Sequence, residues 1–183
     1  MRLVQTPIDG VMVAETNRIE DERGTFQRFF CDVDLHEVVG ERKIVQINHS
    51  KTRHVGTVRG MHFQFPPHAE TKFVRCLRGR VWDVVIDLRK GSPTFRHWRA
   101  EILSPENAHL LVIPEGCAHG FQVLEPDSEL LYLHSAHYEP ASEGGIRHDD
   151  PLIAIRWPLV VEQLSERDLS YPFLTSDFRG ITV

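Results

Sequence analysis

The sequence predicts an all-β fold: an antiparallel sandwich or barrel with a few short helices. Short runs rich in β-branched and aromatic residues recur about every 8 to 12 residues, and Gly and Pro separate them. This spacing favours antiparallel strands over alternating β and α units. The 183 residues suffice for a substantial core, so we expect a single domain over residues 1–183.

The first fifty residues read as short strands around polar turns. Strands are expected over residues 10–13 and 25–30, with a polar turn at 20–24 and one short helix over 32–41. Residues 43–50 alternate again, and this places Gln46, Asn48 and Ser50 on one face of a strand. A polar face of this kind indicates a ligand or a water-filled pocket.

The central stretch, residues 58–87, interleaves polar groups with bulky apolar ones. The turns are expected at Pro66-Pro67 and at residues 77–80. The embedded polar residues are Arg59, His62, Gln64, Lys72 and Asp83. Strand alternation sends these groups toward what we interpret as one interior, where they need partners or a ligand. Their co-location is the first functional signal.

The remaining elements follow the same pattern. Strands are expected over residues 98–103, 109–113, 119–124 and 129–134, with turns at 91–94 and 104–107. Residues 142–183 are rich in loops and prolines, and one short helix is expected near residues 160–166.

Composition excludes several classes of protein. The net charge is −5 with interspersed signs, so there is no basic stripe and no nucleic-acid partner is expected. No apolar run is long enough to span a membrane and no signal peptide is recognisable, which predicts a cytoplasmic protein without a membrane partner. Cys31, Cys76 and Cys117 have unrelated spacings that fit reduced thiols.

Two motifs resemble those of cupins, which form jelly-roll barrels. Residues 114–119 have the Pro-x-Gly-x-x-His form of the second cupin motif, and Gly56 with His62 resembles the opening of the first. Metal-binding cupins place a second His two residues after the first, where this chain has Gln64. With Glu70 at an unusual spacing, the ligand set is incomplete, so we predict no metal and an interior used for acid–base chemistry.

His62 is then the candidate base, and a carboxylate must fix its tautomer. The candidate carboxylates are Asp83, Asp87, Asp149, Asp150 and Asp168. Spacing alone does not choose among them. Lys72 is a candidate to stabilise an enolate oxygen, and Tyr132 or Tyr138 to return a proton. Arg59 is a candidate phosphate binder, because a guanidinium grips phosphate with two hydrogen bonds.

Over nearly its whole length the sequence resembles the dTDP-4-dehydrorhamnose 3,5-epimerases. The matching segments are residues 21–26 (DERGTF), 46–50 (QINHS), 59–64 (RGMHFQ), 79–89 (GRVWDVVIDLR), 92–95 (SPTF), 113–121 (IPEGCAHGF), Tyr132 with Tyr138, 149–151 (DDP), 155–158 (IRWP) and 164–168 (LSERD). So many matches in the same order make the resemblance specific.

The resemblance implies a cupin-type antiparallel jelly-roll barrel that works as a homodimer without metal or cofactor. It implies His62 as base, Asp168 as its partner, Lys72 at the 4-keto oxygen and Tyr132 as acid. The residues implied around the substrate are Arg59, His119, Tyr138, Gln46, Asn48, Asp83 and Glu143, with Arg23 and Phe26 reaching the nucleotide of the partner subunit.

The substrate expected from the resemblance is dTDP-4-dehydro-6-deoxy-D-glucose, inverted at C3 and C5. Arg28 departs from the family pattern, where a Glu is usual, and His148 stands where a polar amide is more common. The sequence therefore leaves open which nucleotide base and which sugar the substrate contains. The alternatives are a mono-epimerase, an epimerase of another 4-keto nucleotide sugar such as a GDP-heptose, a non-catalytic binding module, and a metal-dependent cupin oxygenase or isomerase.

Overall fold

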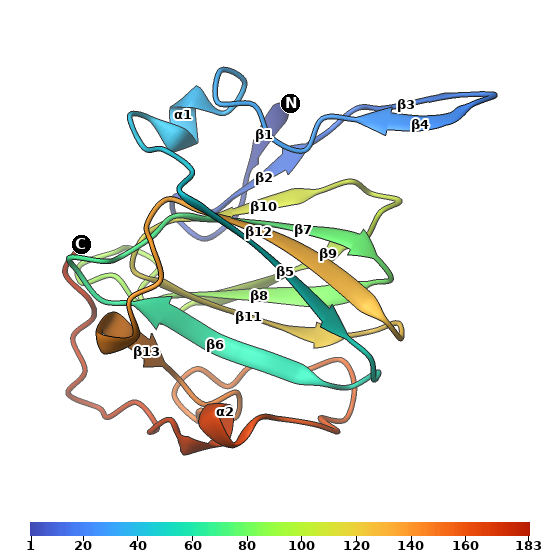
Figure 1. The fold of residues 1–183 in the computed structure, drawn as a ribbon. Coiled ribbons are helices and arrows are strands. Elements are labelled where there is room, and N and C mark those ends of the chain that lie inside the picture. Colours follow the sequence, from blue (N-terminus) through green and yellow to red (C-terminus); the bar gives the residue numbers. More distant parts are fainter.

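Two antiparallel sheets pack face to face in the computed structural model, which describes residues 1–183 (Figure 1). One sheet has six strands in the order β1 (Arg2–Gln5), β2 (Met12–Glu15), β10 (Leu110–Ile113), β7 (Lys72–Arg78), β12 (Ser128–His134) and β5 (Gln46–Thr52). The other has five, in the order β13 (Glu143–Gly145), β6 (Val58–Gln64), β11 (Cys117–Val123), β8 (Val81–Asp87) and β9 (Trp98–Leu103). The prediction of an all-β antiparallel fold is confirmed.

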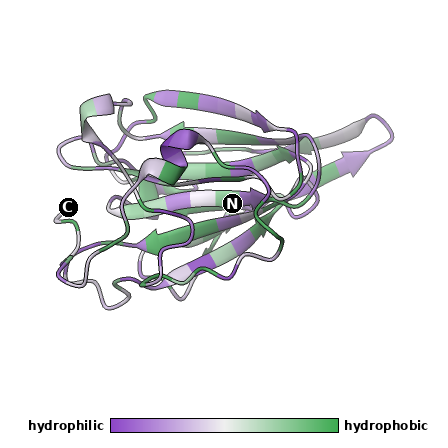
Figure 2. Ribbon diagram, turned by 90° about the horizontal axis from the view of Figure 1, so that it is seen from below, coloured by the Kyte–Doolittle hydropathy of each residue, from purple (hydrophilic) through white to green (hydrophobic).

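Apolar residues cover both faces of the central strands, which explains why these strands are almost continuously apolar. Between the sheets lies a cluster that includes Val74, Val85 and Leu130. The neighbours of these residues in sequence point outward, as alternation requires. Phe73 packs under α1 (His36–Val39), whereas Val84 is covered by the chain after residue 146. Figure 2 shows hydrophobic residues running along the strands of both sheets.

A close approach of two strands brings two histidines together at the pocket. On β6 and β11, His62 and His119 are cross-strand partners, and the register shifts between His119 and Phe121. A Cβ on Gly60 would lie 2.5 Å from the Cα of Gly120, so this approach needs glycine, and Gly60 also has a positive φ of 130°. The two strands can therefore carry both imidazoles side by side.

The helices differ from the sequence expectation. The first is confined to His36–Val39, within the predicted residues 32–41. The helix expected near residues 160–166 is wrong: α2 spans Glu166–Ser170. Its N-cap is Ser165, whose hydroxyl accepts from the Asp168 amide, so the helix starts only after that serine. Upstream, the backbone of residues 162 and 163 bonds instead to residues 56 and 58.

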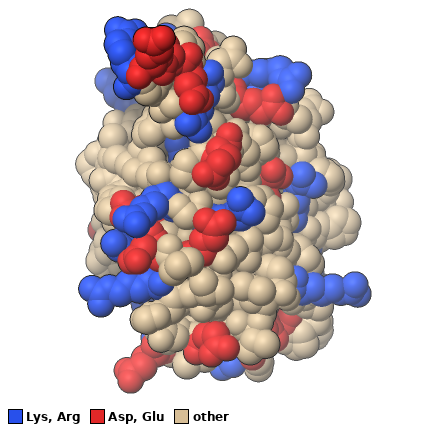
Figure 3. All heavy atoms as spheres, turned by 90° about the vertical axis from the view of Figure 1, so that its right-hand side faces the viewer, with Lys and Arg blue, Asp and Glu red and all other residues tan.

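A two-stranded hairpin, β3 (Arg18–Asp21) and β4 (Gly24–Gln27), projects from the body of the molecule (Figure 1). The strand predicted over residues 25–30 ends at Gln27, and the predicted polar turn becomes the tip of this hairpin. Ile19 and Phe26 are largely exposed on it, at 62% and 71%. On the face shown in Figure 3, acidic and basic side chains are interspersed, without a basic stripe. None of the helices is long and apolar enough to cross a membrane.

Candidate active site

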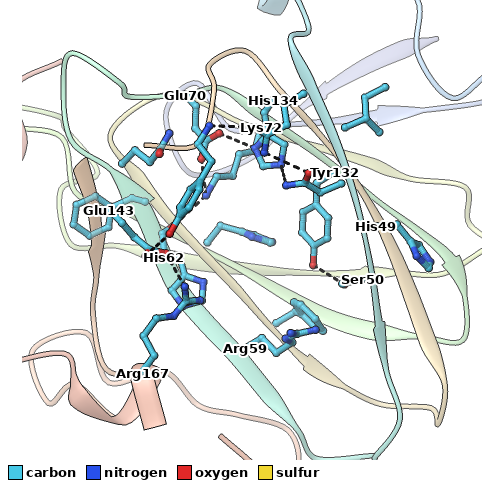
Figure 4. A pocket seen from close by; sticks show the side chains of 18 residues that line it. His49, Ser50, Arg59, His62, Glu70, Lys72, Tyr132, His134, Glu143 and Arg167 are labelled. Carbon is cyan, nitrogen blue, oxygen red and sulfur yellow. Dashed lines mark hydrogen bonds and ion pairs between the residues drawn. The ribbon is translucent and has the colours of Figure 1, made fainter. Parts of the chain in front are cut away.

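One end of the space between the sheets is a cavity of about 960 Å³, whose walls carry mostly polar side chains (Figure 4). Strands β5, β7 and β12 of one sheet and β6 and β11 of the other supply most of the lining. Tyr138, Glu143 and Arg167 complete it at the rim. Of the five polar residues expected in the interior, four line this cavity: Arg59, His62, Gln64 and Lys72.

His62 and Asp168 form a hydrogen-bonded dyad. His62 Nε2 lies 2.7 Å from Asp168 Oδ1, and the other carboxylate oxygen accepts from the Gly60 amide at 3.3 Å. Burial opposes ionisation of Asp168, but the hydrogen bond and charge of His62 outweigh it and hold the pKa of Asp168 below its usual value. A carboxylate at Nε2 fixes the proton on that nitrogen, which leaves the Nδ1 lone pair free to accept a proton.

The structure selects Asp168 from the five carboxylates that spacing left open. Asp87 is held by Arg89, Ser92 and Thr94. Asp149 accepts a hydrogen bond from Arg147, and Asp150 accepts hydrogen bonds from backbone amides. Both carboxylates lie outside the cavity. Asp168 is brought to His62 by α2, 106 residues further along the chain.

Asp83 and His119 form a second dyad, behind the first. His119 Nε2 lies 2.8 Å from Asp83 Oδ1. Asp83 is completely buried and does not line the cavity, whereas His119 does. Burial raises the pKa of Asp83, against the opposing effect of His119. Strand β8 is the neighbour of β11 in the same sheet, and Asp83 on it contacts the cavity-lining His119. The expected contact of Asp83 with substrate stays a prediction.

Tyr132 is the phenol that faces the interior. Its hydroxyl is 3.1 Å from Ser50 Oγ, and its ring meets the His119 ring edge-on with centroids 6.1 Å apart. Burial raises the pKa of Tyr132 well above its usual value, so the hydroxyl keeps its proton at neutral pH. Tyr138, the other candidate, is half exposed at the rim and donates to Glu143 at 3.0 Å.

Lys72 enters the cavity from β7 with a buried ammonium group. Its Nζ lies 3.1 Å from Glu70 Oε1 and donates to the His62 carbonyl at 3.4 Å. Its position on the inward face of β7 follows from the predicted alternation with Val74. The ammonium is thus within the same cavity as the His62 and Tyr132 side chains.

The predicted binding residues divide into two groups. Gln46, Asn48, Arg59, Tyr138 and Glu143 all line the cavity. The Arg59 guanidinium is exposed and makes a single long hydrogen bond of 3.4 Å, to Thr52, so most of its donors are available to an anion.

Arg23 and Phe26 do not line this cavity. They lie on the projecting hairpin, beside a separate shallow hollow of about 410 Å³. Arg23 is paired with Asp21 of the same hairpin. Within one subunit the structure therefore does not bring these two residues to the dyad, and their expected role on a partner's nucleotide stays a prediction.

Several residues of the pocket wall are not among the predicted site residues, and three of them carry polar groups that contact predicted ones. His134 and Arg167 were not considered, and Glu70 entered only as part of an incomplete metal set. Alternation could have found His134, which is two residues after Tyr132 on the same face. Arg167 Nη2 is 3.3 Å from His62 Nε2, and its Nη1 donates to Glu143 at 3.0 Å. No three His, Cys, Asp or Glu side chains group in a way that could hold a metal ion.

The fold and the pocket define a class: a cupin-type jelly-roll barrel whose interior presents an acid–base site. A family model described as dTDP-4-dehydrorhamnose 3,5-epimerase matches residues 5–176. The chain belongs to this family.

Relatives and solved structures agree with that assignment. The chain is 41% identical over 180 residues to the dTDP-4-dehydrorhamnose 3,5-epimerase of Shigella flexneri, covering 97% of this chain and 99% of the relative. It is similar to the structure of dTDP-6-deoxy-D-glucose-3,5-epimerase from Legionella pneumophila in complex with dTDP-4-keto-L-rhamnose, with a TM-score of 0.89, 38% identity, and coverage of 94% and 92%. A 3'-monoepimerase from Streptomyces bikiniensis in complex with dTDP-quinovose has a TM-score of 0.85 and 32% identity, with coverage of 92% and 85%.

Proposed function

We propose that this protein is a nucleotide-sugar epimerase that inverts C3 and C5 of dTDP-4-dehydro-6-deoxy-D-glucose to give dTDP-4-dehydro-L-rhamnose. The observation that carries the proposal is the His62–Asp168 dyad, 2.7 Å apart, in a cavity that also holds Lys72 and the Tyr132 hydroxyl. These are the groups that proton transfer next to a ketone requires. Family membership supports the same reaction.

The reaction uses the acidity that a 4-keto group gives to the hydrogens on both neighbouring carbons. His62 removes the hydrogen through Nδ1 while Asp168, a carboxylate at neutral pH, stabilises the imidazolium that forms. The electron pair moves to the ketone oxygen, where the Lys72 ammonium stabilises the enolate. No electrons leave the sugar, so the chemistry needs no redox cofactor.

Inversion requires a proton from the opposite face of the sugar. Tyr132 belongs to the six-stranded sheet and His62 to the five-stranded one, so the two side chains enter the cavity from opposite walls (Figure 4). Tyr132 gives its proton to the carbon, which leaves an imidazolium at His62 and a phenolate at Tyr132. His62 then releases its proton to water and Tyr132 takes one up from water, so that the same two groups can invert the second carbon. The high pKa of Tyr132 suits an acid that is fully protonated at neutral pH.

The nucleotide is assigned to the open side of the same cavity. Arg59 binds the pyrophosphate, supported by its exposed guanidinium, and His119 lies beside the sugar with Asp83 holding its ring. Tyr138 stacks beside the thymine ring of the nucleotide. Further contacts come from Gln46, Asn48 and Glu143.

A homodimer completes this site, with Arg23 and Phe26 of one subunit reaching the nucleotide of the other. The projecting hairpin and the 71% exposure of Phe26 support this assignment. Sedimentation at several concentrations tests it, and a monomer at all of them would contradict it. A cytoplasmic location is proposed as well, in keeping with three cysteines that form no disulfide.

The decisive experiment is NMR of dTDP-4-dehydro-6-deoxy-D-glucose in deuterium oxide with the purified protein. Deuterium at both C3 and C5, with the rhamno product, is expected. Deuterium at one carbon only would make the protein a mono-epimerase, a reading to which the similarity to the 3'-monoepimerase gives weight. Binding without any exchange would indicate a non-catalytic nucleotide-sugar module, and exchange only with another nucleotide sugar would move the assignment to that substrate.

A further inference from the structure

The ammonium of Lys72 is held by a carboxylate that the proposed reaction does not use. Glu70 Oε1 lies 3.1 Å from Lys72 Nζ, and Glu70 Oε2 lies 2.6 Å from His134 Nδ1. All three side chains are nearly buried, with exposed fractions of 7% for Glu70, 11% for Lys72 and 10% for His134. Burial opposes ionisation of Glu70, but His134 and Lys72 outweigh it and lower its pKa. Glu70 is therefore a charged group with both oxygens engaged.

The His134 ring is fixed from its other side as well. With the proton on Nδ1, where it donates to Glu70, Nε2 is an acceptor, and the amide nitrogen of Asn48 lies 3.3 Å from it. Gln46 in turn donates to Asn48 Oδ1 at 3.3 Å, and Gln46 Oε1 accepts from the backbone amide of Tyr138 at 3.0 Å. Every hydrogen bond in this row is donated in the direction of Glu70. The His134 tautomer with its proton on Nδ1 is therefore compatible with all of these hydrogen bonds.

The geometry also determines where the remaining hydrogen of Lys72 points. An ammonium has three hydrogens in a fixed tetrahedral arrangement. One is directed at Glu70 Oε1 and a second at the His62 carbonyl, 3.4 Å away. The third is therefore left for a ligand in the cavity. Without Glu70, the Lys72 ammonium would keep only the longer hydrogen bond to the His62 carbonyl. The flexible four-carbon side chain could then rotate away from this position.

We propose that Glu70 and His134 are positioning residues that fix Lys72 Nζ at the ketone oxygen of the substrate. This inference rests on the proposed function for the identity of that oxygen. Neither residue needs to touch the reacting carbons, since both act through Lys72. Figure 4 shows the three side chains joined at one side of the cavity.

Glu70→Gln tests the proposal most directly, because it keeps the size of the side chain and removes the charge. A displaced catalytic group costs about a hundredfold in rate per ångström, so kcat is expected to fall about 10- to 100-fold. KM and the dissociation constant for dTDP should stay within about threefold, because the lost interaction acts in the transition state. Thermal unfolding of each variant checks that the fold is intact. Glu101→Gln is the matched control: Glu101 also pairs with a histidine, His109 at 3.1 Å, but lies outside the cavity.

Two substitutions of His134 provide a rescue test. His134→Leu removes both of its hydrogen bonds, and kcat is expected to fall about tenfold. His134→Asn places an amide N–H near the position of Nδ1 and so retains the donation to Glu70. Its kcat should lie between that of His134→Leu and the wild type. Equal rates for the two variants, or Glu70→Gln with unchanged kcat or with an effect on KM alone, would overturn the proposal.

A readout independent of turnover separates this inference from the proposed function. The side-chain ¹³Cε–¹Hε NMR signal of Lys72 is identified by its loss in Lys72→Arg, and the other lysines are Lys43, Lys51 and Lys90. A shifted signal in the wild type that moves to the solvated-lysine position in Glu70→Gln is expected. The same solvated signal in both proteins would contradict the positioning role. If the wild type exchanges no hydrogens of the dTDP sugar, the proposed function fails, while the NMR comparison still decides whether Glu70 orders Lys72.

Discussion

The two ends of the space between the sheets are built from the same strands but differ in chemistry. On β7, Lys72 lies in the cavity, whereas Val74, two residues on, belongs to the apolar cluster. On β12, Tyr132 and His134 line the cavity and Leu130 is in the cluster. All of them point inward, so alternation alone cannot distinguish them. What differs is their depth along the strand.

The two ends also do different work. The apolar end holds the register of the sheets, since a slip of one residue would turn every inward side chain outward. The polar end depends on that register, because its charges are buried and need partners. Three imidazoles there have a carboxylate within 2.8 Å: His62 with Asp168, His119 with Asp83, and His134 with Glu70. A stable apolar end thus makes an otherwise costly polar end possible.

The largest effect is expected at the polar end, from His62→Ala. Loss of a general base costs up to about 10⁴-fold in rate, so exchange at C3 and C5 should fall by about that factor. The dissociation constant for dTDP should change little, because the base does not hold the nucleotide. Deuterium incorporation followed by NMR measures the first quantity, and isothermal titration calorimetry the second. Retained exchange would place the base elsewhere.

The matched substitution at the apolar end is Leu130→Ala. Leu130 is fully buried, and truncation of such a leucine costs about 2 to 5 kcal/mol of unfolding free energy. The kcat of the folded protein should remain within about threefold, since the cavity wall begins only at Tyr132. Urea denaturation gives the stability and steady-state assays the rate. A loss of kcat as large as that of His62→Ala would show that the two ends are not separable.

Tyr132→Phe sharpens the contrast at the boundary between the ends. The ring that packs against the apolar cluster remains, but the hydroxyl and its contact to Ser50 are lost. Inversion should fall about 100-fold, the contribution of a general acid. Exchange with retention should persist, because His62 can still remove a proton and return it on its own side. If exchange and inversion fell together, the phenol would also be needed for enolate formation.

The smallest effect concerns the pH dependence of stability. Folding lowers the pKa of Asp168, so its carboxylate adds stability that is complete above about pH 3.9, the unfolded value, and is lost as the pH falls through the lower native value. The stability difference between the wild type and Asp168→Asn should therefore shrink as the pH falls from about 6 to about 3. Urea denaturation across this range measures it. A constant difference would mean that the pKa of Asp168 is not lowered by folding.

Much of the fold could be predicted from the sequence because strand alternation is local. The expected strands over residues 98–103 and 129–134 form as β9 and within β12. The prediction of a helix near residues 160–166 was wrong because the backbone there forms hydrogen bonds with a distant segment, residues 56–58. A local sequence pattern cannot predict such a long-range contact. Gln46, Asn48 and Lys72 were placed on inward faces by the same alternation and do line the cavity.

The sequence by itself determined which side chains face inward and, through its ordered motifs, the family to which the chain belongs. Only the tertiary structure decided the pairings: Asp168 with His62, Asp83 behind His119, and Glu70 shared by Lys72 and His134. The physical reason is distance along the chain. A hydrogen bond acts over about 3 Å, and partners from strands or helices that are remote in sequence come within that range only when both sheets have packed.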